Sequence, residues 1–211
     1  MCLKTIIKRN SVISLFLVLS GCASSYTRIA PQTIKSYNPT PSEIEGLEFS
    51  YRYDVLAGRG NKRYAKKEQK NATSLVAIRI INNTSTELTL GDNIDLYRNS
   101  EKVELLPKTY VFTSLRQKEA GYFLYLLLTP FTFTVNNEPV IKAPLFGFIV
   151  ATPIIIFNVS KVAGSNGKFK KELEMYSIEN KTIPPQDTLY GLIGIKSGWD
   201  DIKTLNLKLK Q

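Results

Sequence analysis

Carboxylates are the side chains best placed to do chemistry in this sequence, because the 211-residue chain contains no histidine. Histidine is the usual general base near neutral pH and the commonest transition-metal ligand, so Ser-His-Asp triads, Cys-His pairs and His-ligated zinc are excluded. Two acidic clusters remain, Asp92 with Asp95, and Asp200 with Asp201 beside Trp199. The first lacks the ligand spacing of an EF-hand, and the second lies between two predicted strands, as a hairpin turn does.

The absence of histidine and the few acidic clusters predict a non-catalytic protein. The alternative is an enzyme, a hydrolase that uses carboxylates and tyrosine. No cofactor and no metal are expected. The run Gly164–Lys168 places a lysine after glycine but lacks the spacing and the Ser or Thr of a phosphate-binding loop. It is a better match to the beginning of a helix over residues 167–176, with Ser165 or Asn166 as the cap.

Short segments typical of β-strands recur along the chain. Several alternate apolar and polar residues, as half-buried strands do, and residues 75–81 are apolar on nearly both faces, which predicts a central strand. Turn-forming residues separate them. The segments are residues 47–55, 75–81, 87–90, 94–97, 102–106, 188–195 and 204–209. This pattern predicts a mainly β fold, an immunoglobulin-like antiparallel β-sandwich without the cysteine pair of antibody domains. An apolar helical insertion would make the class α+β overall.

The insertion is predicted at about residues 107–179, where the strand pattern stops. Residues 143–160 contain no charged side chain. Residues 121–160 could dip into a membrane, or dock on an envelope complex as part of an accessory subunit. Because prolines divide the segment, we expect packed or interfacial helices in preference to a true span. The candidate contacts with membrane or partner are Tyr122, Phe123, Leu126, Phe146, Phe148 and Ile155.

The N-terminus has the three parts of an export signal. A basic segment is followed by an apolar segment, residues 12–19, that is too short to span a bilayer comfortably. The apolar segment ends in Leu19-Ser20-Gly21-Cys22. This arrangement resembles the lipobox of the bacterial lipoprotein class.

The resemblance implies that residues 1–21 are removed and that Cys22 receives a diacylglyceryl thioether and an acylated amino group. It places the protein in the bacterial cell envelope, anchored by lipid. The residue directly after Cys22 is not Asp. By the same resemblance, this favours the outer membrane in a diderm bacterium. Residues 22–45 would be a lipidated N-terminus and tether, and residues 46–211 a single β-sandwich domain with its insertion.

Removal of residues 1–21 changes the chemistry available to the chain. The segment holds three of the 28 basic residues and none of the 18 acidic ones, so the mature chain carries 25 bases and a net charge of +7. Cys2 leaves with it and Cys22 is acylated, so no thiol remains for a disulfide, a metal or catalysis. Outside the cytoplasm the polyanions are lipid headgroups, glycans and cell-wall polymers, so no nucleic-acid partner is expected.

Residues 59–70 contain six bases and a single acid between the first two predicted strands. As a loop, this segment could contact anionic lipid headgroups or a phosphorylated glycan. Alternatively, it is a solvated connection, as charge runs usually are. The candidate residues are Arg59, Lys62, Arg63, Lys66, Lys67 and Lys70.

The sequence therefore predicts a membrane-anchored envelope lipoprotein that acts as a binding or scaffolding module. Its expected partners are membrane lipid, through acylated Cys22, and an envelope protein. The sequence leaves the oligomeric state open.

Overall fold

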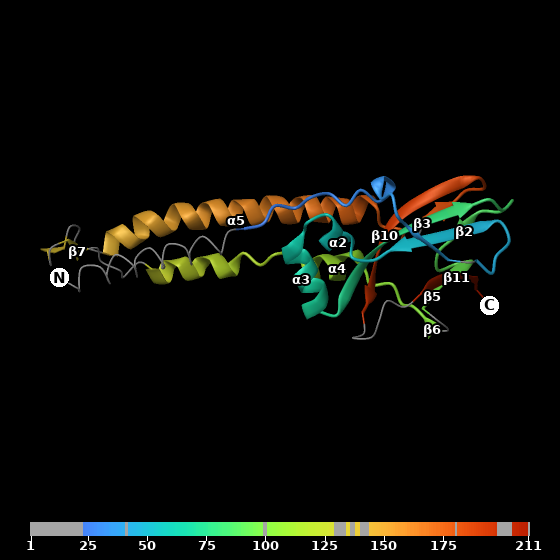
Figure 1. Ribbon diagram of the computed structural model, residues 1–211, viewed down its shortest axis with the longest axis horizontal. Coiled ribbons are helices and arrows are strands. Elements are labelled where there is room, and N and C mark those ends of the chain that lie inside the picture. The colour runs from blue at the N-terminus through green and yellow to red at the C-terminus, as the bar shows by residue number, and fades with distance from the viewer. Residues whose placement is uncertain are drawn as a thin grey trace. The chain divides into compact units, whose positions relative to one another are not determined.

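The computed structural model describes residues 23–40, 42–98, 101–128, 134–135, 138–139, 144–179, 181–197 and 204–210. These residues form helices and antiparallel sheets, which is an α+β fold (Figure 1). The chain divides into two compact units. The helical unit consists of Met1–Ser25 and Lys118–Ser165, and the sheet unit of Tyr26–Gln117 and Asn166–Gln211.

The main sheet of the sheet unit contains four strands in the order β1-β2-β3-β10. Their bounds are Asn38–Thr40, Leu47–Arg52, Thr73–Asn82 and Asp187–Lys196. The third of these, β3, is the central strand predicted from its apolar residues, and it pairs with β10 along its whole length. The strand predicted to reach residue 55 ends earlier, because Asp54 adopts a left-handed conformation, with φ 54°, immediately before helix α2.

A second sheet has the order β11-β5-β6, and β4 pairs separately with β9. The bounds are Leu205–Leu209 for β11, Ile94–Arg98 for β5, Glu101–Lys102 for β6, Leu88–Thr89 for β4 and Thr182–Ile183 for β9. A single apolar core joins one face of the main sheet to β5 and β11. Phe49, Ile78 and Ile193 come from the main sheet, and Ile94 and Leu207 from the second sheet.

Helices pack on the opposite face of the main sheet (Figure 1). They are α2 (Val55–Gly58), α3 (Lys62–Lys70), α4 (Lys108–Leu115) and the end of α5 (Pro144–Met175). A Cβ atom on Gly194 of β10 would lie 2.1 Å from Cγ2 of Val111, so glycine lets α4 pack close to the sheet. This helical layer is absent from a simple β-sandwich, so the sheet unit belongs to the broader α+β class.

The helical unit contains η2 (Ala120–Leu128), strands β7 (Thr134–Val135) and β8 (Glu138–Pro139), and α5 up to Ser165. The prediction that prolines divide this region was wrong for Pro153, which lies inside the 32-residue helix α5. A proline removes one backbone hydrogen bond and can be accommodated in a long helix. The helix cap predicted at Ser165 or Asn166 was also wrong, because α5 continues through both residues.

The helical unit is shorter than the insertion predicted at about residues 107–179. Helix α4 and the end of α5 belong to the sheet unit, because Val111, Leu115, Phe169 and Leu173 fill its core. Within the described part of the chain, no helix combines the length and the apolar character needed to cross a membrane.

Candidate functional site

The segment that follows Cys22 is bound to the protein from Ala23 onward, so the prediction of a tether over residues 22–45 needs correction. In the sheet unit, Tyr26 and Ile29 are buried in the core between the helices and the main sheet. The ring of Tyr26 lies 5.2 Å from that of Tyr64 and 5.3 Å from that of Phe169. Apolar side chains that fill a core cannot remain in a solvated linker, so these residues hold the segment on the domain.

Glu172 of α5 is the main polar contact of this segment in the sheet unit, and only 3% of it is exposed. Its carboxylate accepts hydrogen bonds from the hydroxyl of Tyr26 at 2.6 Å, the amide of Ile29 at 3.1 Å and the amide of Ala30 at 2.7 Å. Burial, followed by the hydrogen bond to Glu172, raises the pKa of Tyr26 well above its usual range. The tyrosine therefore stays a neutral donor.

A buried asparagine also holds this segment. The side chain of Asn61, which precedes α3, accepts from the amide of Thr27 at 2.8 Å and donates to the carbonyl of Thr27 at 2.8 Å. Arg59 donates through Nε to the carbonyl of Ile29 at 3.0 Å and also contacts the hydroxyl of Thr33. Arg59 is thus committed to the N-terminal segment and is removed from the predicted headgroup contacts.

The helical unit holds the residue next to Cys22. Ala23 is 3% exposed and packs with Tyr122 and Val162 in a small core. Its amide donates to Oδ1 of Asn158 at 2.6 Å, and Ser165 donates to the carbonyl of Ser24 at 3.1 Å. The backbone is therefore in direct contact with α5 from Ala23 onward.

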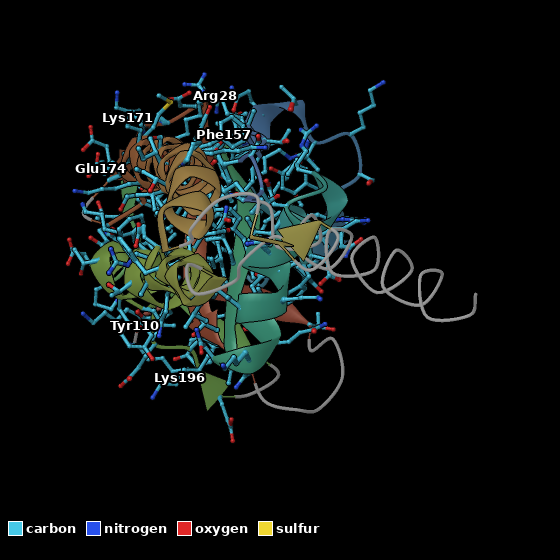
Figure 2. All side chains as sticks on the ribbon, turned by 90° about the vertical axis from the view of Figure 1, so that its left-hand side faces the viewer. Arg28, Tyr110, Phe157, Lys171, Glu174 and Lys196 are labelled. Atoms are coloured by element: carbon cyan, nitrogen blue, oxygen red, sulfur yellow. The ribbon has the colours of Figure 1, made fainter. Side chains whose placement is uncertain are left out.

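The helical unit also exposes large apolar side chains. Phe123, Leu124, Ile156 and Phe157 are 54–66% exposed, and we call them the apolar surface (Phe157 is labelled in Figure 2). The ammonium group of Lys161 lies 5.7 Å from the ring centre of Phe157. Lys161 is half-buried, and an apolar side chain beside a base suits the boundary between acyl chains and headgroups.

The predicted apolar contacts match this surface only in part. Phe123 is exposed, but Tyr122 and Ile155 are buried and cannot form a contact surface. Ile156 and Phe157 take the place of Ile155, because a shift of one residue changes the face of a helix. The predicted residues whose side chains lie outside the described part are Cys22, Leu126, Phe146 and Phe148.

The basic segment forms helix α3, so its prediction as a loop was wrong. One side of α3 is held by Tyr64, which is fully buried, and by Glu68, which accepts from the amide of Leu75 at 2.8 Å. Burial raises the pKa of Glu68 to about 8. The predicted contacts then separate into exposed and half-buried residues. Lys62, Lys66 and Lys70 are exposed, and Arg63 and Lys67 are half-buried.

Of the two acidic clusters, only Asp92 with Asp95 lies within the described residues. Asp95 forms an ion pair with Lys102 at 2.5 Å, while Asp92 is exposed in a turn. Trp199, Asp200 and Asp201 lie outside the described residues. In the part of the chain that the structure covers, no group of three or more potential metal ligands comes together.

Comparisons of the chain with protein-family models, with curated proteins and with solved structures found no match.

Proposed function

We propose that this protein is a lipid-anchored lipoprotein of the bacterial envelope, and that it acts as a non-catalytic binding or scaffolding module on the membrane surface. One observation carries the proposal. Ala23, the residue after Cys22, is buried in the same compact unit that bears the apolar surface. Acyl chains on Cys22 would therefore attach beside exposed phenylalanine, leucine and isoleucine side chains.

The short chain between Cys22 and the sheet unit supports a position close to the bilayer. Tyr26, the first buried residue of the sheet unit, lies four residues after Cys22. An extended chain covers at most about 3.6 Å per residue, so the connection spans no more than about 14 Å. A lipid on Cys22 would hold the sheet unit at the headgroup layer, without the reach of a long tether.

The apolar surface supports membrane contact on energetic grounds. Burying a leucine, isoleucine or phenylalanine side chain completely is worth about 1.5–3 kcal/mol. Phe123, Leu124, Ile156 and Phe157 retain more than half of their exposure, so much of that free energy is still to be gained. Because the lipid anchor already holds the protein on the membrane, the acyl chains of the bilayer are available to the apolar surface without a separate association step.

The proposed fold of the binding module is an immunoglobulin-like sandwich with an added helical layer. The apolar core shared by the main sheet with β5 and β11 supports this proposal. In such a module the loops at the ends of the sheets offer surfaces for an envelope protein.

Fatty-acid labelling tests the anchor. The full chain, expressed in a bacterium that is fed an alkyne analogue of palmitate, is expected to take up the label and to sediment with membranes. The chain contains two cysteines, so Cys22→Ser should lose the label while Cys2→Ser, the matched control, keeps it. Label that persists in Cys22→Ser would contradict the proposal.

A further inference from the structure

Helix α3 presents an exposed row of lysines. Five of its nine residues are basic, and Lys62, Lys66 and Lys70 follow one another at intervals of four residues, which places them on one side of the helix. All three are exposed. None of them takes part in the ion pairs formed within the described residues. We call these three residues the lysine row.

The lysine row lowers the stability of its own helix. Like charges four residues apart are destabilising by about 0.2–0.5 kcal/mol per pair. Lysine at the first position also meets the positive end of the helix dipole, and no side chain caps α3. The single acid of α3, Glu68, is buried on the opposite side, where its raised pKa keeps it largely uncharged at neutral pH. The positive charge is therefore not balanced within the helix.

The chain connectivity keeps the lysine row near the anchor. Asn61, directly before Lys62, holds both backbone groups of Thr27. Thr27 lies five residues after Cys22, a distance of at most about 18 Å in extended chain. An anchored Cys22 thus confines the beginning of α3 to the neighbourhood of the headgroup layer.

We propose that the lysine row binds the anionic phospholipid headgroups of the leaflet that holds the Cys22 anchor. Position and charge together favour anionic headgroups as the ligand, because the short chain between Cys22 and Thr27 keeps α3 near the headgroup phosphates. The inference rests on the proposed lipid anchor and adds to it a specificity for anionic lipid. Each lysine near an anionic surface should change the ratio of docked to undocked helix about fivefold, so loss of all three should change it on the order of 100-fold.

Quenching of a dye on α3 tests the proposal with the intact lipidated protein. Gln69 is exposed between lysines of the row, and the acylated mature chain has no other free thiol, so Gln69→Cys accepts a single fluorophore. The protein is reconstituted into vesicles that contain a lipid with a nitroxide on its headgroup. One set is pure phosphatidylcholine, and the other contains one part phosphatidylglycerol to two parts phosphatidylcholine. Quenching should be stronger in the anionic set and should weaken at high salt.

Variants separate the lysine row from general charge. Lys62→Gln, Lys66→Gln and Lys70→Gln together should abolish the difference between the two vesicle sets. The matched control changes Lys168, Lys170 and Lys171, three exposed lysines of α5, to glutamine and should preserve it.

Three results would overturn the inference. They are equal quenching in both vesicle sets, equal losses in both triple variants, and binding of a soluble phosphorylated glycan by α3 without any response to phosphatidylglycerol. Fatty-acid labelling of the same preparations keeps the two proposals apart. Unlabelled Cys22 would remove the anchor itself, whereas labelled Cys22 without anionic-lipid quenching would remove only the role of the lysine row.

Discussion

Replacement of Glu172 by alanine is expected to release the N-terminal segment from the sheet unit. The carboxylate accepts from the Tyr26 hydroxyl and from the amides of Ile29 and Ala30. Tyr26 and Ile29 are buried, so their donors would lose their partner without access to bulk water. Ala30 is only half-buried, and water can replace its bond.

The magnitude follows from those two buried donors. An unsatisfied buried polar group costs about 1–3 kcal/mol, and bonds to a charged acceptor lie in the upper part of that range. Glu172→Ala should therefore destabilise the attachment of the segment by about 4 kcal/mol. Both buried donors bond to the same oxygen, Oε2, so Glu172→Gln can keep them with its carbonyl oxygen at that position and should cost clearly less than Glu172→Ala.

Trypsin provides the assay, because Arg28 lies exposed within the held segment (Figure 2). Cleavage after Arg28 requires local opening, and a change of about 4 kcal/mol increases the open population about a thousandfold. Glu174→Ala is the matched control. Glu174 is exposed on the same helix and pairs with Lys170 at 3.9 Å, an interaction worth about 0.3–0.5 kcal/mol.

Equal rates of cleavage after Arg28 in Glu172→Ala and Glu174→Ala would contradict this role of the carboxylate. The same midpoint of urea unfolding for both variants would also contradict it. Either result would mean that the packing of Tyr26 and Ile29 holds the segment without the carboxylate.

The remaining predictions concern α3, the close packing of α4 and a helical glycine. Because burial raises the pKa of Glu68 to about 8 from 4.5, the folded state binds its proton more tightly, and this contribution to stability falls between pH 4.5 and 8 by about 1.4 kcal/mol per pH unit. Glu68→Gln should remove that slope in urea unfolding measured at several pH values, and an unchanged slope would refute the assignment. Gly194→Ala should cost about 1–3 kcal/mol, because the new methyl group would lie 2.1 Å from Cγ2 of Val111. Gly164→Ala should instead stabilise α5 by about 0.5–1 kcal/mol, since no atom lies within 4 Å of the place that its new methyl group would take; thermal unfolding of the two glycine variants should thus give shifts of opposite sign.

Much of the sheet unit could be predicted from the sequence, because alternating burial determines which face of a strand meets the core. The predicted strands at 75–81, 188–195 and 204–209 correspond to β3, β10 and β11. The helix α3 was not predicted, because Tyr64 is its only large apolar side chain and most of the others are charged. Its other buried side chain is a glutamate, a residue type that hydropathy predicts to be exposed.

The attachment of the N-terminal segment depends on contacts between residues far apart in the sequence, such as Tyr26 with Glu172. One local signal pointed to it. Glu172 lies close in sequence to Phe169, Leu173 and Tyr176, which pack in the core, and an acid among core residues needs a buried donor. Nothing in the local sequence identifies Asn61 as the residue that holds Thr27.

The anchored protein is expected to place its helical unit against the bilayer. Single-cysteine variants Phe157→Cys and Met175→Cys each carry a fluorophore in reconstituted lipidated protein. Both residues are exposed apolar positions of α5, but only Phe157 belongs to the helical unit. Vesicles with nitroxides on the acyl chains should quench the dye at position 157 and leave the dye at position 175 bright. Equal quenching at both positions, or a bright dye at position 157, would contradict the claim, and the second result would assign the apolar surface to a protein partner.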